Sequence, residues 1–114
     1  MKIGLFGGTF DPVHLGHLIA AEDIMKACKL DKVIFIPAAR PPHKNEKAVT
    51  SAADRYHMVK LAIKPFPGFE ISDHELKKPG KSFTIDTVKY FKVKNTKKDK
   101  IYFIIGADIV EQLT

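Results

Sequence analysis

The chain has 114 residues, of which 45% are hydrophobic and 28% charged, and this composition is ordinary for one globular domain. Cys28 is its single cysteine, which excludes an intramolecular disulfide and a cysteine-based metal cluster. No segment approaches the roughly 18 apolar residues that span a membrane, and the apolar run after Lys2 is too short for a signal peptide. We therefore expect a cytoplasmic protein with no membrane association.

The formal net charge of +6 is unevenly distributed, because nine lysines lie between Lys77 and Lys100. Such a surface is compatible with nucleic-acid binding. The lysines are scattered, however, with no arginine and few aromatic residues between them. We interpret most of them as a solvated face and expect no nucleic-acid partner.

The first predicted elements are a buried strand at residues 3–6, a glycine turn, and an amphipathic helix over about residues 15–29. Apolar residues recur along this helix at spacings of three and four, namely Leu15, Leu18, Ala21, Met25 and Cys28. The chain then predicts a second strand at residues 32–36, which Pro37 stops. Residues 38–50 hold two prolines and several charges without periodicity, which indicates a mobile loop.

A capping box at residues 51–54 predicts the start of a second helix, with a buried stripe formed by Met58, Leu61 and Ala62. Arg55 is assigned a packing position beside Met58. A third strand is predicted at residues 69–72 and a fourth at residues 101–105. Between them Thr84 is a candidate cap for a helix whose inner face consists of Ile85, Val88 and Phe91.

Alternating strands and helices predict an α/β fold, a Rossmann-like parallel sheet with flanking helices. The strands are continuously apolar, as expected for a sheet that is covered on both faces. Ligands of such sheets bind beyond the carboxyl ends of the strands. Candidate site residues should therefore gather where the predicted strands end, at Gly7, Pro37, Ser72 and Gly106.

Two histidines mark the first of these ends. His14 and His17 lie three residues apart, which places them on one face of the helix N-terminus. Unpaired N–H groups and partial positive charge at that terminus favour a polyphosphate. Gly7 and Gly8 permit a tight turn close to a ligand, and Gly16 leaves space for a bulky group. In the alternative interpretation, the histidines only cap the helix or lie on its surface.

Residues 7–17, Gly-Gly-Thr-Phe-Asp-Pro-Val-His-Leu-Gly-His, resemble the nucleotide-binding signature of the nucleotidylyltransferase superfamily, and most closely that of the nicotinate mononucleotide adenylyltransferases. The resemblance implies that His14 and His17 are catalytic and contact the phosphates of ATP. It also implies nucleotide contacts from the rest of the turn, at Gly7, Gly8, Thr9, Phe10 and Gly16.

Two further segments resemble motifs of the same family. In the Pro-Pro-His-Lys run at residues 41–44, the resemblance assigns substrate contact to His43 and charge compensation to Lys44. Arg40, just before this run, is a weaker candidate for such a contact. In the run from residue 82 to residue 87, Ser-Phe-Thr-Ile-Asp-Thr, a helix N-terminus would receive the nicotinate carboxylate. The substrate-binding residues expected there are Ser82, Phe83 and Thr84. Alternatively, Lys44 is a solvated lysine and Thr84 an ordinary cap.

Gly106 and Asp108 follow the fourth predicted strand, at the place where the family has a Gly-x-Asp beside the adenosine of ATP. The alternative is a turn in which Asp108 caps the next helix, and we expect the chain to end inside that helix. The family continues with another strand and an arginine-bearing segment. We therefore expect residues 1–114 to form a single nucleotidylyltransferase-like domain that is truncated at its C-terminus.

The implied reaction is adenylyl transfer from ATP to nicotinate mononucleotide in NAD biosynthesis, which releases pyrophosphate. No carboxylate cluster resembles a dedicated metal site, so Mg²⁺ is expected to arrive with ATP. Homo-oligomerisation stays open. The alternatives are another nucleotidylyltransferase, such as phosphopantetheine adenylyltransferase or a cytidylyltransferase, and a non-catalytic nucleotide-binding module. Phosphopantetheine adenylyltransferase usually has threonine where His14 stands.

Overall fold

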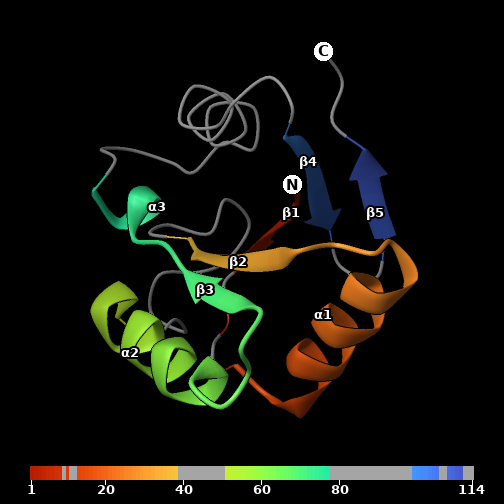
Figure 1. Cartoon of the computed structure of the whole chain (residues 1–114). Helices are drawn as coiled ribbons and strands as arrows, with labels where there is room; N and C mark the ends of the chain where they lie inside the picture. Colours follow the sequence, from red (N-terminus) through yellow and green to blue (C-terminus); the bar gives the residue numbers. More distant parts are fainter. Residues whose placement is uncertain (9, 11–12, 39–50, 78–98, 106–107, 112–114) are drawn as a thin grey trace.

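The computed structural model describes residues 1–8, 10, 13–38, 51–77, 99–105 and 108–111. Five strands form one sheet in the order β3-β2-β1-β4-β5 (Figure 1). Their bounds are β1 (Lys2–Gly8), β2 (Lys32–Pro37), β3 (Phe69–Ile71), β4 (Lys100–Ile105) and β5 (Asp108–Glu111). The helices are α1 (Leu15–Ala27), α2 (Ala52–Ile63) and the short α3 (His74–Lys77).

The first four strands run parallel to one another, so their carboxyl ends meet at one edge. Strands β1, β2 and β3 step outward to one side, whereas β4 pairs with β1 on the other side. The strand order therefore reverses between β1 and β4, which is where sheets of this kind bind ligands. The predicted Rossmann-like parallel sheet with flanking helices is confirmed.

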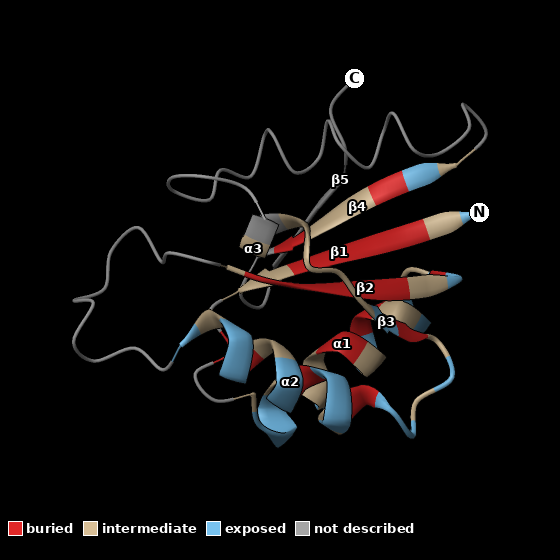
Figure 2. Cartoon of the chain, turned by 90° about the vertical axis from the view of Figure 1, so that its left-hand side faces the viewer, coloured by how far each residue is buried: buried red, intermediate tan, exposed pale blue. Residues whose placement is uncertain are grey.

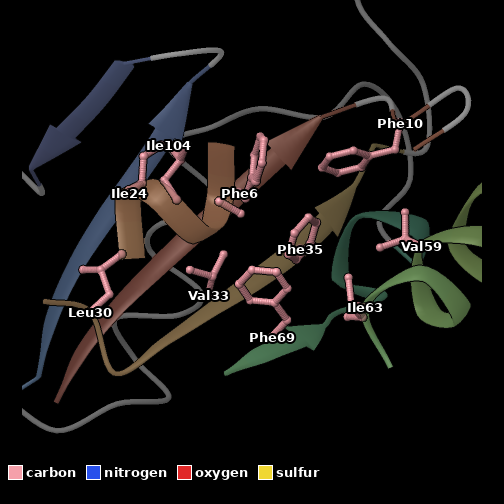
Figure 3. Close-up of a cluster of buried hydrophobic side chains, with 11 residues drawn as sticks. Phe6, Phe10, Ile24, Leu30, Val33, Phe35, Val59, Ile63, Phe69 and Ile104 are labelled. Atoms are coloured by element: carbon pink, nitrogen blue, oxygen red, sulfur yellow. The ribbon is translucent and has the colours of Figure 1, made fainter. Parts of the chain in front are cut away.

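Both faces of the sheet carry apolar side chains, because alternate residues of a strand point to opposite faces. Helices α1 and α2 lie on the same side of the sheet (Figure 2). The buried cluster on that side consists of Phe6, Phe10, Ala21, Ile24, Leu30, Val33, Phe35, Val59, Ile63, Phe69 and Ile104 (Figure 3). The cluster on the opposite face consists of Ile3, Leu5, Ile34, Ile36 and Ile101.

Helix α1 agrees with its predicted start and runs to Ala27, with Cys28 as the C-cap. Its buried face differs from the predicted one at two positions. Leu15 is 68% exposed, and Ile24 is buried instead. Leu15 occupies the first position of the helix, before α1 comes to lie against the sheet, so its side chain projects into solvent.

Helix α2 begins as predicted, since the Ser51 hydroxyl accepts a hydrogen bond from the Asp54 N–H at 3.2 Å. The predicted buried stripe of Met58 and Leu61 is wrong, because both side chains are exposed, Leu61 by 70%. The buried residues are Arg55, Val59 and Ile63. The sequence of α2 has apolar side chains on two faces of the helix. The face that packs against the sheet is the one with the β-branched side chains of Val59 and Ile63.

The prediction for the segment after β4 is wrong. We expected a helix after β4, but Asp108–Glu111 forms β5, which pairs antiparallel with β4. Ile109 and Val110 lie in this segment, and their β-branched side chains favour strand over helix. The predicted loop over residues 38–50 and the predicted helix capped by Thr84 lie outside the described residues. Among the helices of the described part, none is long and apolar enough to cross a membrane.

Candidate functional site

The N-terminus of α1 lies beyond the carboxyl end of β1, where the strand order reverses. His14 is the N-cap residue of α1, with an extended backbone, and its Nδ1 accepts a hydrogen bond from the Gly16 N–H at 3.1 Å. The Nδ1 atom of His17 accepts the His14 N–H at 3.0 Å. The two imidazoles therefore form a reciprocal capping box, in which each ring satisfies a backbone donor.

This geometry changes how the helix terminus can bind an anion. We expected unpaired backbone N–H groups, but the ring nitrogens of the two histidines occupy those of His14 and Gly16. Because each Nδ1 is an acceptor, each neutral ring carries its proton on Nε2. The Nε2–H groups of the two rings are thus donors that a ligand can use. Capping and ligand binding, which were alternatives from the sequence, are thus compatible in this arrangement.

The two imidazoles are stacked, with ring centroids 3.9 Å apart and 26° between their planes. Stacking at this distance leaves no room for a ligand between the rings, so a polyanion would lie beside them, at the Nε2–H groups. The pair is consequently suited to binding phosphate oxygens through one Nε2–H donor on each ring.

His17 is partly buried against aromatic side chains. Its ring lies edge-to-face with Phe10, at 5.1 Å between centroids and 79° between planes, and at 6.2 Å from Phe6. Burial lowers the pKa of His17 below its ordinary value, and the neighbouring His14 lowers this pKa further. At neutral pH His17 is therefore an uncharged hydrogen-bond donor through Nε2.

The lowered pKa of His17 makes the stability of the chain depend on pH. In the unfolded chain His17 has its ordinary pKa of about 6.5, so below that pH the unfolded state binds more protons than the folded state. The contribution of the uncharged His17 to the free energy of unfolding is fully present above the pKa of the unfolded state. It is lost as the pH falls through the pKa of the folded state. We expect the free energy of unfolding, measured in urea, to fall more steeply below pH ~6.5 in the native chain than in His17→Gln. Equal slopes for the two proteins would contradict this assignment.

The glycines of the turn leave space for the side chains packed against them. A Cβ on Gly16 would lie 2.9 Å from Cε1 of His14, so the space that we expected for a ligand is filled by the His14 ring. A Cβ on Gly7 would meet the Phe103 ring, and a Cβ on Gly8 the Phe10 ring, each at 3.2 Å. These glycines therefore allow the aromatic and imidazole rings to pack closely against the backbone.

Phe10 is the buried residue of the turn. The resemblance implies a nucleotide contact at this position, and because the side chain is 3% exposed and belongs to the core, such a contact would come from the Phe10 backbone. Its backbone has φ of 50°, in the left-handed region that a phenylalanine rarely adopts. Nothing in the local sequence signals this conformation, since Gly7 and Gly8 are the residue types that normally form such a turn.

The remaining predicted site residues cannot be placed beside the histidines. Thr9, the pair His43 and Lys44, the turn at residues 82–84, and Gly106 lie outside the described residues, as does Arg40. Asp108 begins β5, where its backbone pairs with Ile105. At the carboxyl-end edge of the sheet, the Ala38 N–H that follows β2 donates to the carbonyl of Gly8 at the end of β1, at 2.9 Å.

Similarity to a known family extends well beyond the histidine pair. The sequence model of the family described as cytidylyltransferase-like matches residues 5–114. The chain belongs to the cytidylyltransferase-like family. This assignment agrees with the superfamily that residues 7–17 resemble.

Within this cytidylyltransferase-like family, the chain is similar to curated proteins named probable nicotinate-nucleotide adenylyltransferase. The protein of Shouchella clausii (strain KSM-K16) is 50% identical over 112 residues, which are 98% of this chain and 58% of that relative. The protein of Caldicellulosiruptor bescii is 49% identical over 113 residues, which are 99% of this chain and 56% of that relative. The chain thus spans a little over half the length of these relatives.

Two solved structures share the fold. Both are of the Plasmodium falciparum nicotinic acid mononucleotide adenylyltransferase, one complexed with NaAD and one with APC. The TM-scores are 0.72 and 0.67, each at 19% identity over 90% of this chain and about half of that chain. At this identity the match shows that the cytidylyltransferase-like chain shares the fold of these structures over about half of their length.

The described part of the cytidylyltransferase-like site offers no cluster of metal ligands. Among the described residues, no three histidine, cysteine, aspartate or glutamate side chains lie close enough together to hold an ion. The donors of this part of the site are imidazole N–H groups, which bind anions rather than Mg²⁺. The residues that the structure describes therefore fit the phosphate groups of a nucleotide better than a protein-bound cation.

Proposed function

We propose that the chain takes part in adenylyl transfer from ATP to nicotinate mononucleotide, which yields nicotinate adenine dinucleotide and pyrophosphate in NAD biosynthesis. The proposal depends mainly on the stacked pair of His14 and His17, which lies where the strand order reverses. The capping box uses the Nδ1 atom of each ring, so each Nε2–H group can donate to a ligand. The names of relatives about 50% identical over nearly the whole chain support the choice of substrates.

In the proposed reaction, a phosphate oxygen of nicotinate mononucleotide attacks the α-phosphorus of ATP. A P–O bond forms there, while the bond from the α-phosphorus to the oxygen that bridges to the β-phosphorus breaks. That oxygen leaves with pyrophosphate. The attacking phosphate is already ionised near neutral pH, so the chain has no need of a strong general base. Catalysis rests on alignment and on neutralising the developing charge.

The histidine pair supplies part of that neutralisation. Nε2–H of His14 and Nε2–H of His17 donate to phosphate oxygens of ATP, and Lys44 compensates charge on the substrate or on pyrophosphate. Mg²⁺, expected to arrive with ATP, would supply further neutralisation of the phosphate charge. We assign nicotinate recognition to His43 and the turn at residues 82–84, and adenosine contacts to Gly106 and Asp108, on the basis of the family resemblance.

An NMR titration of the ring nitrogens tests the nucleotide site. Adding ATP with Mg²⁺ to the ¹⁵N-histidine-labelled chain is expected to shift the Nε2 resonances of His14 and His17. His57, which is exposed on α2, is the internal control and should not move. CTP with Mg²⁺ tests the cytidylyltransferase alternative, and we expect weaker binding. Equal small shifts of all histidines, or a preference for CTP, would contradict the proposal.

A further inference from the structure

Phe10 adopts a backbone conformation that its residue type disfavours. Among the described residues, only Phe10 and Lys29 have positive φ without being glycine. Lys29 follows the end of α1, where a left-handed residue is common. Phe10 does not end a helix, since it lies in the connection between β1 and α1. Such strain persists only where the surrounding structure holds it, and it gathers at functional sites.

The left-handed backbone directs the Phe10 ring into an aromatic group that ends at the histidines. The ring lies 5.3 Å from Phe6 and 5.6 Å from Phe35 (Figure 3), and 5.1 Å from His17. The backbone of Gly8 closes another side, because even a Cβ there would come within 3.2 Å of the Phe10 ring. The ring thus has little freedom to shift away from the imidazole.

His17 has few other constraints. One hydrogen bond holds its ring to the backbone, from the His14 N–H to Nδ1, and one face stacks on the exposed His14. Phe6 contacts it at a longer centroid distance than Phe10 does. The titratable neighbour whose charge acts on His17 is His14, while β1 and the turn present Phe6 and Phe10. Phe10 is therefore the nearest apolar support of the imidazole.

We infer that Phe10 is a positioning residue for His17: its edge-to-face contact keeps the imidazole in the orientation in which Nδ1 accepts and Nε2–H is free to donate. The purpose of this orientation, donation to a nucleotide phosphate, rests on the proposed function. The orientation itself does not depend on it. By excluding water from one side of the ring, Phe10 also contributes to the burial of His17.

A merely structural explanation is that Phe10 fills the core. Phe69 provides the matched control, because it is buried in the same cluster and lies 5.2 Å from Phe35. Phe69 also stacks on Phe66, and among the described rings it contacts neither histidine. Phe10→Leu and Phe69→Leu remove the same atoms from one core, and only the former removes a contact with His17.

The experiment is a pH titration of the ¹⁵N-histidine-labelled chain, in which NMR reports the pKa and the tautomer of His17. For Phe10→Leu we expect the pKa of His17 to rise and the Nδ1–H tautomer to become populated. Phe69→Leu should leave both unchanged while losing comparable stability in urea. An unchanged tautomer and pKa in Phe10→Leu, or the same changes in Phe69→Leu, would overturn the inference.

A second variant keeps the test decisive if Phe10→Leu does not fold. Gly8→Ala leaves Phe10 in place but pushes its ring by a few tenths of an ångström, and it should alter the same His17 signals. A folded Gly8→Ala with native His17 signals would contradict the positioning role of Phe10.

Titration with ATP and Mg²⁺ separates the positioning role of Phe10 from the proposed function. We expect Phe10→Leu to bind ATP about threefold to tenfold more weakly than the native chain. Altered His17 signals with no ATP binding by the native chain would retain positioning and refute the proposed function.

Discussion

Replacement of His17 by alanine is expected to lower the rate of adenylyl transfer by about 10²-fold or more, which is the usual effect of losing one transition-state donor. The Nε2–H of His17 is free for a phosphate because Nδ1 accepts the His14 N–H. A donor held in this way stabilises charge as it develops on the phosphoryl oxygens, without reorganising during the reaction. The measurement is the rate of pyrophosphate release at saturating ATP and nicotinate mononucleotide.

The same substitution removes one half of the capping box, so stability must be measured in parallel. Losing a cap of this kind costs about 1 kcal/mol, which would leave most molecules of an ordinary domain folded at 25 °C. His57→Ala, on the exposed face of α2, is the matched histidine control and should keep the native rate. A near-native rate for His17→Ala, with the helix still formed, would contradict the assigned role of His17.

Replacement of Phe35 by alanine is expected to lower the free energy of unfolding by about 3–5 kcal/mol, as for other fully buried phenylalanines. Phe35 is inaccessible to solvent and lies on β2, with ring contacts to Phe6, Phe10 and Phe69 at 5.2–5.6 Å. The substitution leaves a cavity among rigid rings that cannot collapse easily. Urea unfolding monitored by circular dichroism measures the loss.

Two comparisons sharpen this stability test. Phe35→Leu fills most of the volume and should cost clearly less than the alanine variant. Met58→Ala, at a position that is 40% exposed on α2, should change the free energy of unfolding by no more than about 0.5 kcal/mol. A loss of under about 1 kcal/mol in Phe35→Ala would refute the packing described around β2.

The order of the first four strands and of α1 and α2 was predictable because each of these strands has an apolar run bounded by a turn signal, whereas the short helix α3 and the strand β5 were not predicted. Pro37 ends β2, and the Ser51 hydroxyl caps α2 as its sequence indicated. The parallel sheet follows from the alternation of strands and helices, and its carboxyl-end edge follows from the parallel order. The position of the histidine pair at this edge was therefore predictable from the sequence.

The packing of individual side chains was less predictable, since it depends on neighbours distant in sequence. Met58 and Leu61 are as apolar as Val59 and Ile63, and only the sheet decides which stripe of α2 is buried. Arg55, in contrast, is 1% exposed, which agrees with the packing position assigned to it although its charge favours the surface. The strand at Asp108–Glu111 depends on pairing with β4, which the local sequence does not specify.

The internal geometry of the site was the hardest part to predict. The spacing of His14 and His17 indicates a shared face, but it does not specify that each Nδ1 accepts a backbone N–H. The positive φ of Phe10 arises because its ring fits between Phe6, Phe35 and His17, a set of contacts from three separate segments. Motif spacing indicates the chemistry, whereas this packing sets the orientation of the donors.

The most direct measurement is turnover of the chain with ATP, Mg²⁺ and nicotinate mononucleotide, with dinucleotide and pyrophosphate quantified together. Nicotinamide mononucleotide in place of the nicotinate substrate is the control for specificity. The proposed function predicts equal amounts of nicotinate adenine dinucleotide and pyrophosphate, formed in preference to the nicotinamide product. The absence of both products, together with no shift of the His14 and His17 resonances on adding ATP, would contradict it.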